Sequence, residues 1–229
     1  MAEYTGQWGI LGVENGSLLL MSTINVTNVT LNGKKDYLTD GTIKLNNACA
    51  PYKNELYATK ARSVKVEDIN RINGYKEPAT KEYTYTMVDG HVKRNDQTNP
   101  SSQTKFEDID GKKLPDDVQI SIIEDTYSYK FLSNIPSESK AYNLITDKID
   151  NSYAFYWLDN KYVGSYAGDV RWGFRSVIYD GVGGIDNNAL WLTYWGNSGA
   201  NRGARTVIVL KSDIQISETA NSEGMYEIN

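Results

Sequence analysis

The chain has 229 residues and a formal net charge of -5, a size that allows one large domain with a sizeable core. Lys and Arg are scattered without a run, whereas a nucleic-acid backbone needs a basic face, so we exclude nucleic acid as a partner. The Met1 end has neither a basic stretch nor an apolar run of signal-peptide length. We therefore expect a chain without an export signal that does not insert into a membrane.

The single cysteine and the single histidine limit the chemistry that the chain can perform. An intrachain disulfide, a thiolate metal cluster and a site with several His ligands are all excluded. Cys49 lies within Leu45–Ala50, which predicts a small buried side chain rather than a reactive thiol. His91 follows the predicted turn at Asp89–Gly90, and no nucleophile-elbow motif accompanies it. We expect no metal, no cofactor and no enzymatic activity.

The first predicted element is a β-hairpin. Two apolar runs, Trp8–Val13 and Ser17–Met21, flank Asn15–Gly16, a pair that supplies the positive φ angles of tight hairpin turns. The β-branched residues between Ile24 and Leu31 predict a further strand that ends at Asn32–Gly33.

Two short helices are predicted next. The first covers Asp40–Tyr52, with Asp40 or Thr42 as its N-cap and Pro51 at its end. The second covers Val66–Asn73, where acidic residues occupy the first turn and Gly74 follows the last.

The middle of the chain predicts a second hairpin, Tyr83–Val92, that turns at Asp89–Gly90. A polar loop at Lys93–Lys105 follows, and alternating apolar residues predict strands around 118–122 and 127–131.

One short motif in this region resembles a cation site. Asp108–Gly111 is similar to the start of a calcium-binding loop, but Leu114 and Pro115 interrupt the spacing and the closing bidentate Glu is missing. This pattern favours a plain turn.

The composition changes in the last third of the chain. Four of the five tryptophans and six tyrosines fall between Tyr153 and Asn201, interleaved with Gly, Asn, Asp and Ser. Stiff aromatic rings and short polar side chains together are typical of antibody-like contact surfaces. The alternative is that these rings fill the core of a β-rich domain, which we expect for Trp157. We expect Trp191 and Trp195 on the surface instead, because they alternate with Leu190, Leu192 and Tyr194.

The apolar run Val207–Leu210 predicts a final core strand, and we expect the first hairpin to pack beside it because both are apolar β segments that need partners. We expect Trp172, Tyr179, Trp191, Tyr194 and Trp195 to form one exposed patch on a scaffold that includes Trp157, Gly173, Gly184 and Leu210.

Several sequence blocks resemble those of a known family. These blocks are Trp8–Leu20, Leu45–Cys49, Ala61–Ile69, Tyr156–Leu158, Gly173–Arg175, Gly183–Ile185 and Gly203–Ile214. In them the chain is similar to prophage-encoded proteins with the C-type-lectin fold of formylglycine-generating-enzyme-like domains, some of which are variable proteins of diversity-generating retroelements. Two departures are Asp159–Lys161, where the family has Ala-Ser-Arg, and Thr206, where it has Pro.

The resemblance implies an α+β, C-type-lectin-like fold, β-rich with two short helices and a long irregular C-terminal segment. It implies one domain over residues 1–229, with an insertion at 76–150 and a variable ligand-binding segment at 151–215. The implied ligand-binding residues are Asp159, Asn160, Tyr162, Tyr166, Asp169, Arg171, Trp172, Tyr179, Asn187, Trp191, Tyr194, Trp195 and Asn197.

Three functions follow from the resemblance. The first is a receptor-binding module of a phage or phage-like particle, made in the bacterial cytoplasm, that attaches to a host-surface protein or glycan. The second is a structural or decoration protein whose aromatic residues contact other particle proteins or a second copy of the chain. The third is an enzyme of the formylglycine-generating kind. That chemistry needs reactive cysteines near the C-terminal end, and the last third has none.

Overall fold

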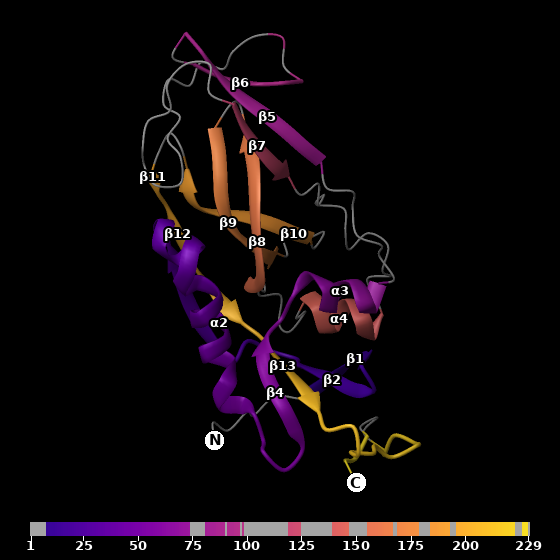
Figure 1. Cartoon of the computed structure of the whole chain (residues 1–229). Helices are drawn as coiled ribbons and strands as arrows, with labels where there is room; N and C mark the ends of the chain where they lie inside the picture. The colour runs from indigo at the N-terminus through magenta and orange to yellow at the C-terminus, as the bar shows by residue number, and fades with distance from the viewer. Residues whose placement is uncertain are drawn as a thin grey trace.

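The structure of the chain is a computed structural model that describes residues 8–73, 81–89, 91–96, 98, 119–124, 139–146, 155–166, 169–178, 184–192, 196–222 and 226–228. These ranges form an α+β arrangement of three sheets with a few short helices (Figure 1). The sheet-rich α+β class agrees with the class predicted from the sequence.

A four-stranded sheet joins the two ends of the described chain. Its strand order is β1 (Trp8–Glu14), β2 (Ser17–Ser22), β13 (Thr206–Leu210) and β4 (Ala58–Ser63). Asn15 and Gly16 have φ angles of 50° and 79°, so the predicted tight turn between β1 and β2 is confirmed. In β13, Val207 pairs with Met21 and with Arg62, which confirms that the first hairpin lies beside the last strand.

A six-stranded sheet contains most of the last third of the chain. Its order is β11 (Gly196–Asn197), β10 (Gly184–Leu192), β9 (Asp169–Ile178), β8 (Tyr156–Tyr166), β12 (Gly199–Ala204) and β3 (Thr27–Asn32). Residues 211–222 form no named strand, but the described residues between 156 and 210 are mostly strand, so the expected long irregular C-terminal segment is wrong there. Gly, Asn and Asp favour loops, but antiparallel neighbours satisfy the backbone groups of this segment, and pairing overrides that weak local preference.

A third sheet has the order β6 (His91–Arg94), β5 (Lys81–Val88) and β7 (Gln119–Glu124). The second predicted hairpin is confirmed, with Asp89 at a φ angle of 50°. The predicted polar loop starts too early, because Lys93 and Arg94 still belong to β6. The turn at Asp108–Gly111 and the strand at 127–131 lie outside the described residues.

The first helical region is longer than predicted. It consists of α1 (Gly33–Lys35), a π-helical turn η1 (Asp36–Asp40), α2 (Gly41–Cys49) and a 3-10 turn η2 (Ala50–Tyr52). Asp40 is not a side-chain cap, because its backbone is helical and it makes no capping hydrogen bond. Such π-turns are rare and occur often at functional sites.

The second predicted helix is confirmed as α3 (Val66–Asn73), and α4 (Lys140–Thr146) is a helix that the sequence did not predict. Both helices lie between the four-stranded sheet and the strands β8 and β9 (Figure 1). Within the described ranges, every helix is too short or too polar to cross a membrane.

Two apolar clusters hold these layers together. One joins β1, β2 and β13 to both helices, and it includes Ile69, Ile145 and Tyr156. The other lies between α2 and the six-stranded sheet, where Trp157 is fully buried and its indole N–H donates to the Val29 carbonyl at 2.8 Å. The expected burial of Trp157 and Leu210 is confirmed.

Candidate functional site

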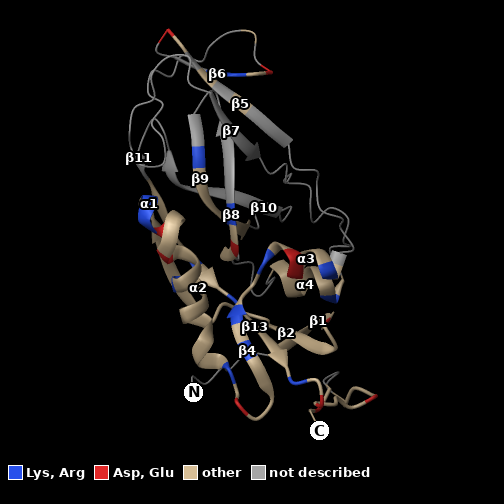
Figure 2. Ribbon diagram, in the orientation of Figure 1, with Lys and Arg blue, Asp and Glu red and all other residues tan. Residues whose placement is uncertain are grey.

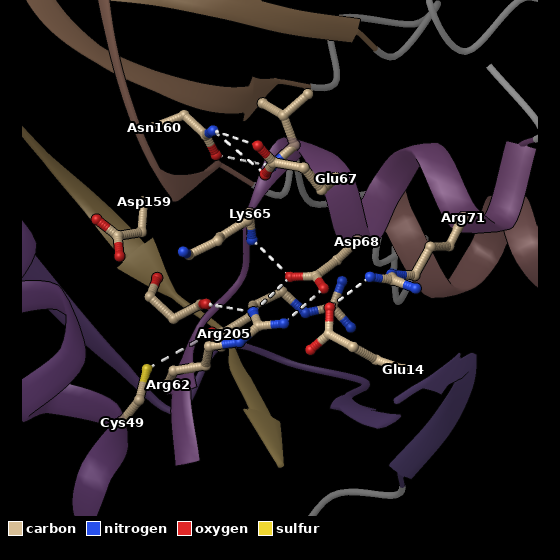
Figure 3. Close-up of polar contacts among 12 residues, drawn as sticks. Glu14, Cys49, Arg62, Lys65, Glu67, Asp68, Arg71, Asp159, Asn160 and Arg205 are labelled. Carbon is tan, nitrogen blue, oxygen red and sulfur yellow. Dashed lines mark hydrogen bonds and ion pairs between the residues drawn. The ribbon is translucent and has the colours of Figure 1, made fainter. Parts of the chain in front are cut away.

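A buried ion pair lies between β4 and the start of α3 and forms the centre of a polar cluster (Figure 3). Arg62 binds Asp68 through two contacts, Nη1 to Oδ2 at 2.6 Å and Nη2 to Oδ1 at 2.8 Å. Asp68 also accepts the backbone N–H of Lys65 at 2.8 Å, as an acidic residue in a first helical turn can do. Burial acts to lower the pKa of the Arg62 guanidinium, but the hydrogen bonds and charge of Asp68 outweigh it and raise that pKa.

Asn160, a predicted ligand-binding residue, extends this cluster from β8. Its side-chain oxygen accepts the backbone N–H of Val66 at 2.8 Å, which satisfies one of the free donors in the first turn of α3. Its amide nitrogen lies 3.3 Å from both carboxylate oxygens of Glu67. Asn160 therefore acts as a cap supplied by a distant strand.

Asp159, the preceding predicted residue, is also engaged within the fold. Its backbone N–H donates to the Val64 carbonyl at 2.8 Å, and its Oδ2 accepts the side-chain amide of Asn46 at 2.9 Å. Asp159, Asn160 and Lys161 all lie in β8. The departure from the family pattern at these three residues suits a binding loop, but the structure places them in a strand, and Asp159 and Asn160 bind α2 and the start of α3.

Cys49 is buried, as the sequence predicted. Its Sγ donates to the Arg205 carbonyl at 3.6 Å, and the side chain has no exposed surface. Burial raises the pKa of the thiol to about 11, so the thiolate, which is the reactive form, is scarce at neutral pH.

Arg205 is a buried cation that links three elements. Its Nε donates to the Ser22 carbonyl at 2.8 Å, and its Nη1 donates to the carbonyls of Leu144 and Ile145 at the end of α4. The guanidinium also lies 5.1 Å from the ring centre of Tyr156. A cation favours the negative end of a helix, so these contacts explain how α4 is fixed to the core.

Among the remaining predicted residues, the structure describes the side chains of Trp172 and Arg171. Trp172 is only 8% exposed, so its predicted place in an exposed patch is wrong. It lies in β9, which has β8 and β10 on its two sides, and such a central position favours burial. Arg171 is half-buried.

The structure gives only the backbone of several other predicted residues. Tyr162, Tyr166, Asp169, Asn187, Trp191 and Asn197 lie in β8 to β11, whereas Tyr179, Tyr194 and Trp195 lie outside the described residues. The register places Trp191 opposite both Trp172 and Asn197. The sheet therefore brings three of the predicted positions together.

Sequence reasoning missed a surface hollow next to this group. The hollow has a volume of about 560 Å³ and is lined by Thr30, Asn32, Ser198, Gly199, Ala200 and Asn201. We call it the β3–β12 hollow, after the strands that form its floor. The Gly33 N–H donates to the Ser198 carbonyl at 2.8 Å, and α1 contacts β10 and β11. The sequence signal for this polar face is the alternation of Asn28, Thr30 and Asn32 with Val29 and Leu31.

A second hollow of about 490 Å³ adjoins the first at Asn32 and is lined by residues of α1 and η1. Basic and acidic residues lie close together in this part of the chain (Figure 2). Lys35 lies 2.9 Å from Asp40, and this hydrogen bond raises the pKa of Lys35 and lowers that of Asp40. Buried Asp36 binds Lys44 at 2.6 Å and accepts the Asn32 N–H at 2.7 Å.

Comparison with known proteins finds no relative of this chain. No family model matches it, and no match is found among curated proteins or solved structures. Any functional conclusion therefore rests on the residues described above.

Proposed function

We propose that the chain is a non-enzymatic recognition protein of a phage or phage-like particle. In this proposal the chain is one C-type-lectin-like domain over residues 1–229, and its last third binds a host-surface protein or glycan. The segment 76–150 is an insertion whose final helix, α4, packs against the core.

The positions of the family-like blocks support this proposal. Trp8–Leu20 forms most of β1 and β2, Ala61–Ile69 covers the end of β4 and the start of α3, and Gly203–Ile214 contains β13. These blocks lie far apart in the sequence but meet in one four-stranded sheet. A scaffold of this kind can hold a sequence-variable segment without losing its core.

One observation carries the proposal: the buried residues of the last third and its aromatic-rich positions lie in the same six-stranded sheet. Trp157 of β8 and Phe174 of β9 are fully buried beneath α2, while β9 continues to positions that pair with β10, and β10 in turn pairs with β11. Binding residues placed on strands are held more precisely than residues placed on loops.

A structural role in a particle is the second candidate, favoured by exposed apolar side chains on another part of the molecule. Ile10 and Val13 of β1 are 43% and 60% exposed, and Leu56 is 71% exposed in the turn before β4. Subunit contacts commonly bury such side chains.

The proposal is tested by measuring attachment of the labelled full chain to a panel of bacterial cell envelopes. Trp191→Ala and Trp195→Ala are expected to weaken attachment by about 2 kcal/mol, as central aromatic anchors do, with unchanged melting temperature. If both variants unfold the protein, or if both attach normally, the aromatic segment is not the contact surface. Ile10→Ser is the matched variant for the structural role, because it alters an exposed apolar residue outside the last third.

A further inference from the structure

The β3–β12 hollow has an uncharged lining. The six described residues of the lining are Thr, Asn, Ser, Gly, Ala and Asn, and none of these six carries a formal charge. Two ion pairs lie in the adjoining helical region: Lys35 pairs with Asp40, and Asp36 pairs with Lys44. Lys161 donates to the Leu38 carbonyl at 3.0 Å and lies over the Tyr37 ring. The hollow therefore offers little attraction to an ionic group.

The lining is rich in unused hydrogen-bonding groups. The side chains of Thr30, Asn32, Ser198 and Asn201 are exposed, and none has a hydrogen-bond partner among the residues that the structure describes. Hydroxyl and amide groups can each donate and accept. Four such side chains around one hollow match a ligand that is itself covered in hydroxyl groups.

The backbone beneath these groups is rigid. All six residues of β12 pair in register with β3, from Gly199 opposite Asn32 to Ala204 opposite Thr27. A Cβ atom on Gly199 would lie 2.4 Å from the Asn32 Cβ and 2.8 Å from the Leu31 carbonyl oxygen. Glycine at this position lets the strands approach closely and leaves space above them. The polar groups are thus held in place before any ligand arrives, which reduces the entropy lost on binding.

We propose that the β3–β12 hollow binds a neutral oligosaccharide, an inference that rests on the proposed function and selects glycan over protein as the ligand. A protein partner would be expected to find a large apolar or aromatic anchor, but among the described residues of the lining the only apolar side chain is that of Ala200. Asn197, which precedes Ser198, is in register with Trp191 of β10, and β10 contacts both β12 and β3, so the hollow adjoins the aromatic segment.

The experiment measures binding of the full chain to an array of immobilised neutral hexose and N-acetylhexosamine oligomers, with sulfated and uronic-acid oligomers as charged counterparts. Asn32→Ala and Asn201→Ala are each expected to weaken binding to a neutral oligomer about tenfold, because each removes side-chain hydrogen bonds. Asn28→Ala is the matched control, since Asn28 is an exposed Asn of the same strand but does not line the hollow. It is expected to bind normally.

Three results would overturn the inference: no neutral oligomer binds, only charged oligomers bind, or the hollow variants bind like Asn28→Ala. Attachment to cell envelopes separates this inference from the proposed function. If envelopes are bound through Trp191 while no neutral oligomer binds, the inference fails and the proposed function stands. If neutral oligomers bind with the expected pattern but no envelope does, the inference stands and the proposed function fails.

Discussion

Two groups of polar residues in this protein both contain asparagine, but the side chains of one group bind within the fold and those of the other are exposed. The Arg62–Asp68–Asn160 cluster lies where β4, α3 and β8 meet, and its side chains bind one another or the backbone of α3. The β3–β12 hollow lies on the outer face of two strands at the end of the six-stranded sheet, and its side chains remain available.

The difference shows that residue type alone does not identify a binding residue. Asn160 and Asn201 have the same side chain, and both occupy strands of one sheet. Asn160 faces the free backbone donors of a helix start, whereas Asn201 faces solvent. A polar side chain close to unsatisfied backbone groups is used to satisfy them, because leaving a buried group unpaired is costly.

The largest expected effect comes from breaking the buried ion pair. Asp68→Ala should lower the free energy of unfolding by about 3–5 kcal/mol, because it leaves the Arg62 guanidinium buried without its partner. Denaturant unfolding measures this loss. The double variant Arg62→Met with Asp68→Leu should recover most of it, since both charges are then absent. A loss below about 1 kcal/mol for Asp68→Ala would show that water reaches the pair.

A smaller effect is expected from the pH dependence of Cys49. The thiol pKa is near 9.0 without the fold and about 11 within it, so the folded chain retains the thiol proton more strongly. The contribution of the Cys49 thiol to the free energy of unfolding should be fully present below pH 9. It should fall by roughly 2–3 kcal/mol as the pH rises from 9 to 11. Unfolding measured across this range should show the fall in the native chain. Cys49→Ala should show a flatter profile, and identical profiles would contradict the prediction.

The direct comparison of the two polar groups is Asn160→Ala against Asn201→Ala. Asn160→Ala removes a helix cap and should cost about 1 kcal/mol of stability, with oligosaccharide binding retained. Asn201→Ala should change stability by less than about 0.5 kcal/mol while weakening binding. Melting curves and the oligomer array measure the two quantities. Equal effects of both variants on stability would remove the distinction between the two groups.

The smallest expected effect is that of metal removal. Among the described residues, no cluster of three His, Cys, Asp or Glu side chains could hold a metal ion. A chelator such as EDTA should therefore leave the melting temperature and the attachment to envelopes unchanged. A lower melting temperature in EDTA would contradict this prediction, and Asp180, Asp186 and Asn187 would then be the first residues to test as cation ligands.

Local signals in the sequence predicted the elements that depend on few residues. The turn at Asn15–Gly16 needs two positive φ angles, and this pair adopts them readily, so the first hairpin follows directly. The second helix follows from the acidic first turn of α3 and its apolar positions Ile69 and Ile72. The start of the first helical region was missed because the π-turn at Asp36–Asp40 breaks the regular helical spacing.

The sequence by itself determined the sheet-rich class, the burial of Trp157 and Cys49, and the pairing of the first hairpin with the last strand, because apolar runs must find apolar partners. Only the tertiary structure decided that Trp172 is buried, that Asn160 caps α3, and that Thr30 and Asn201 share one hollow. Those outcomes depend on which strand lies beside which. Strand order is fixed by contacts between residues that are far apart in the chain, so no local pattern carries it.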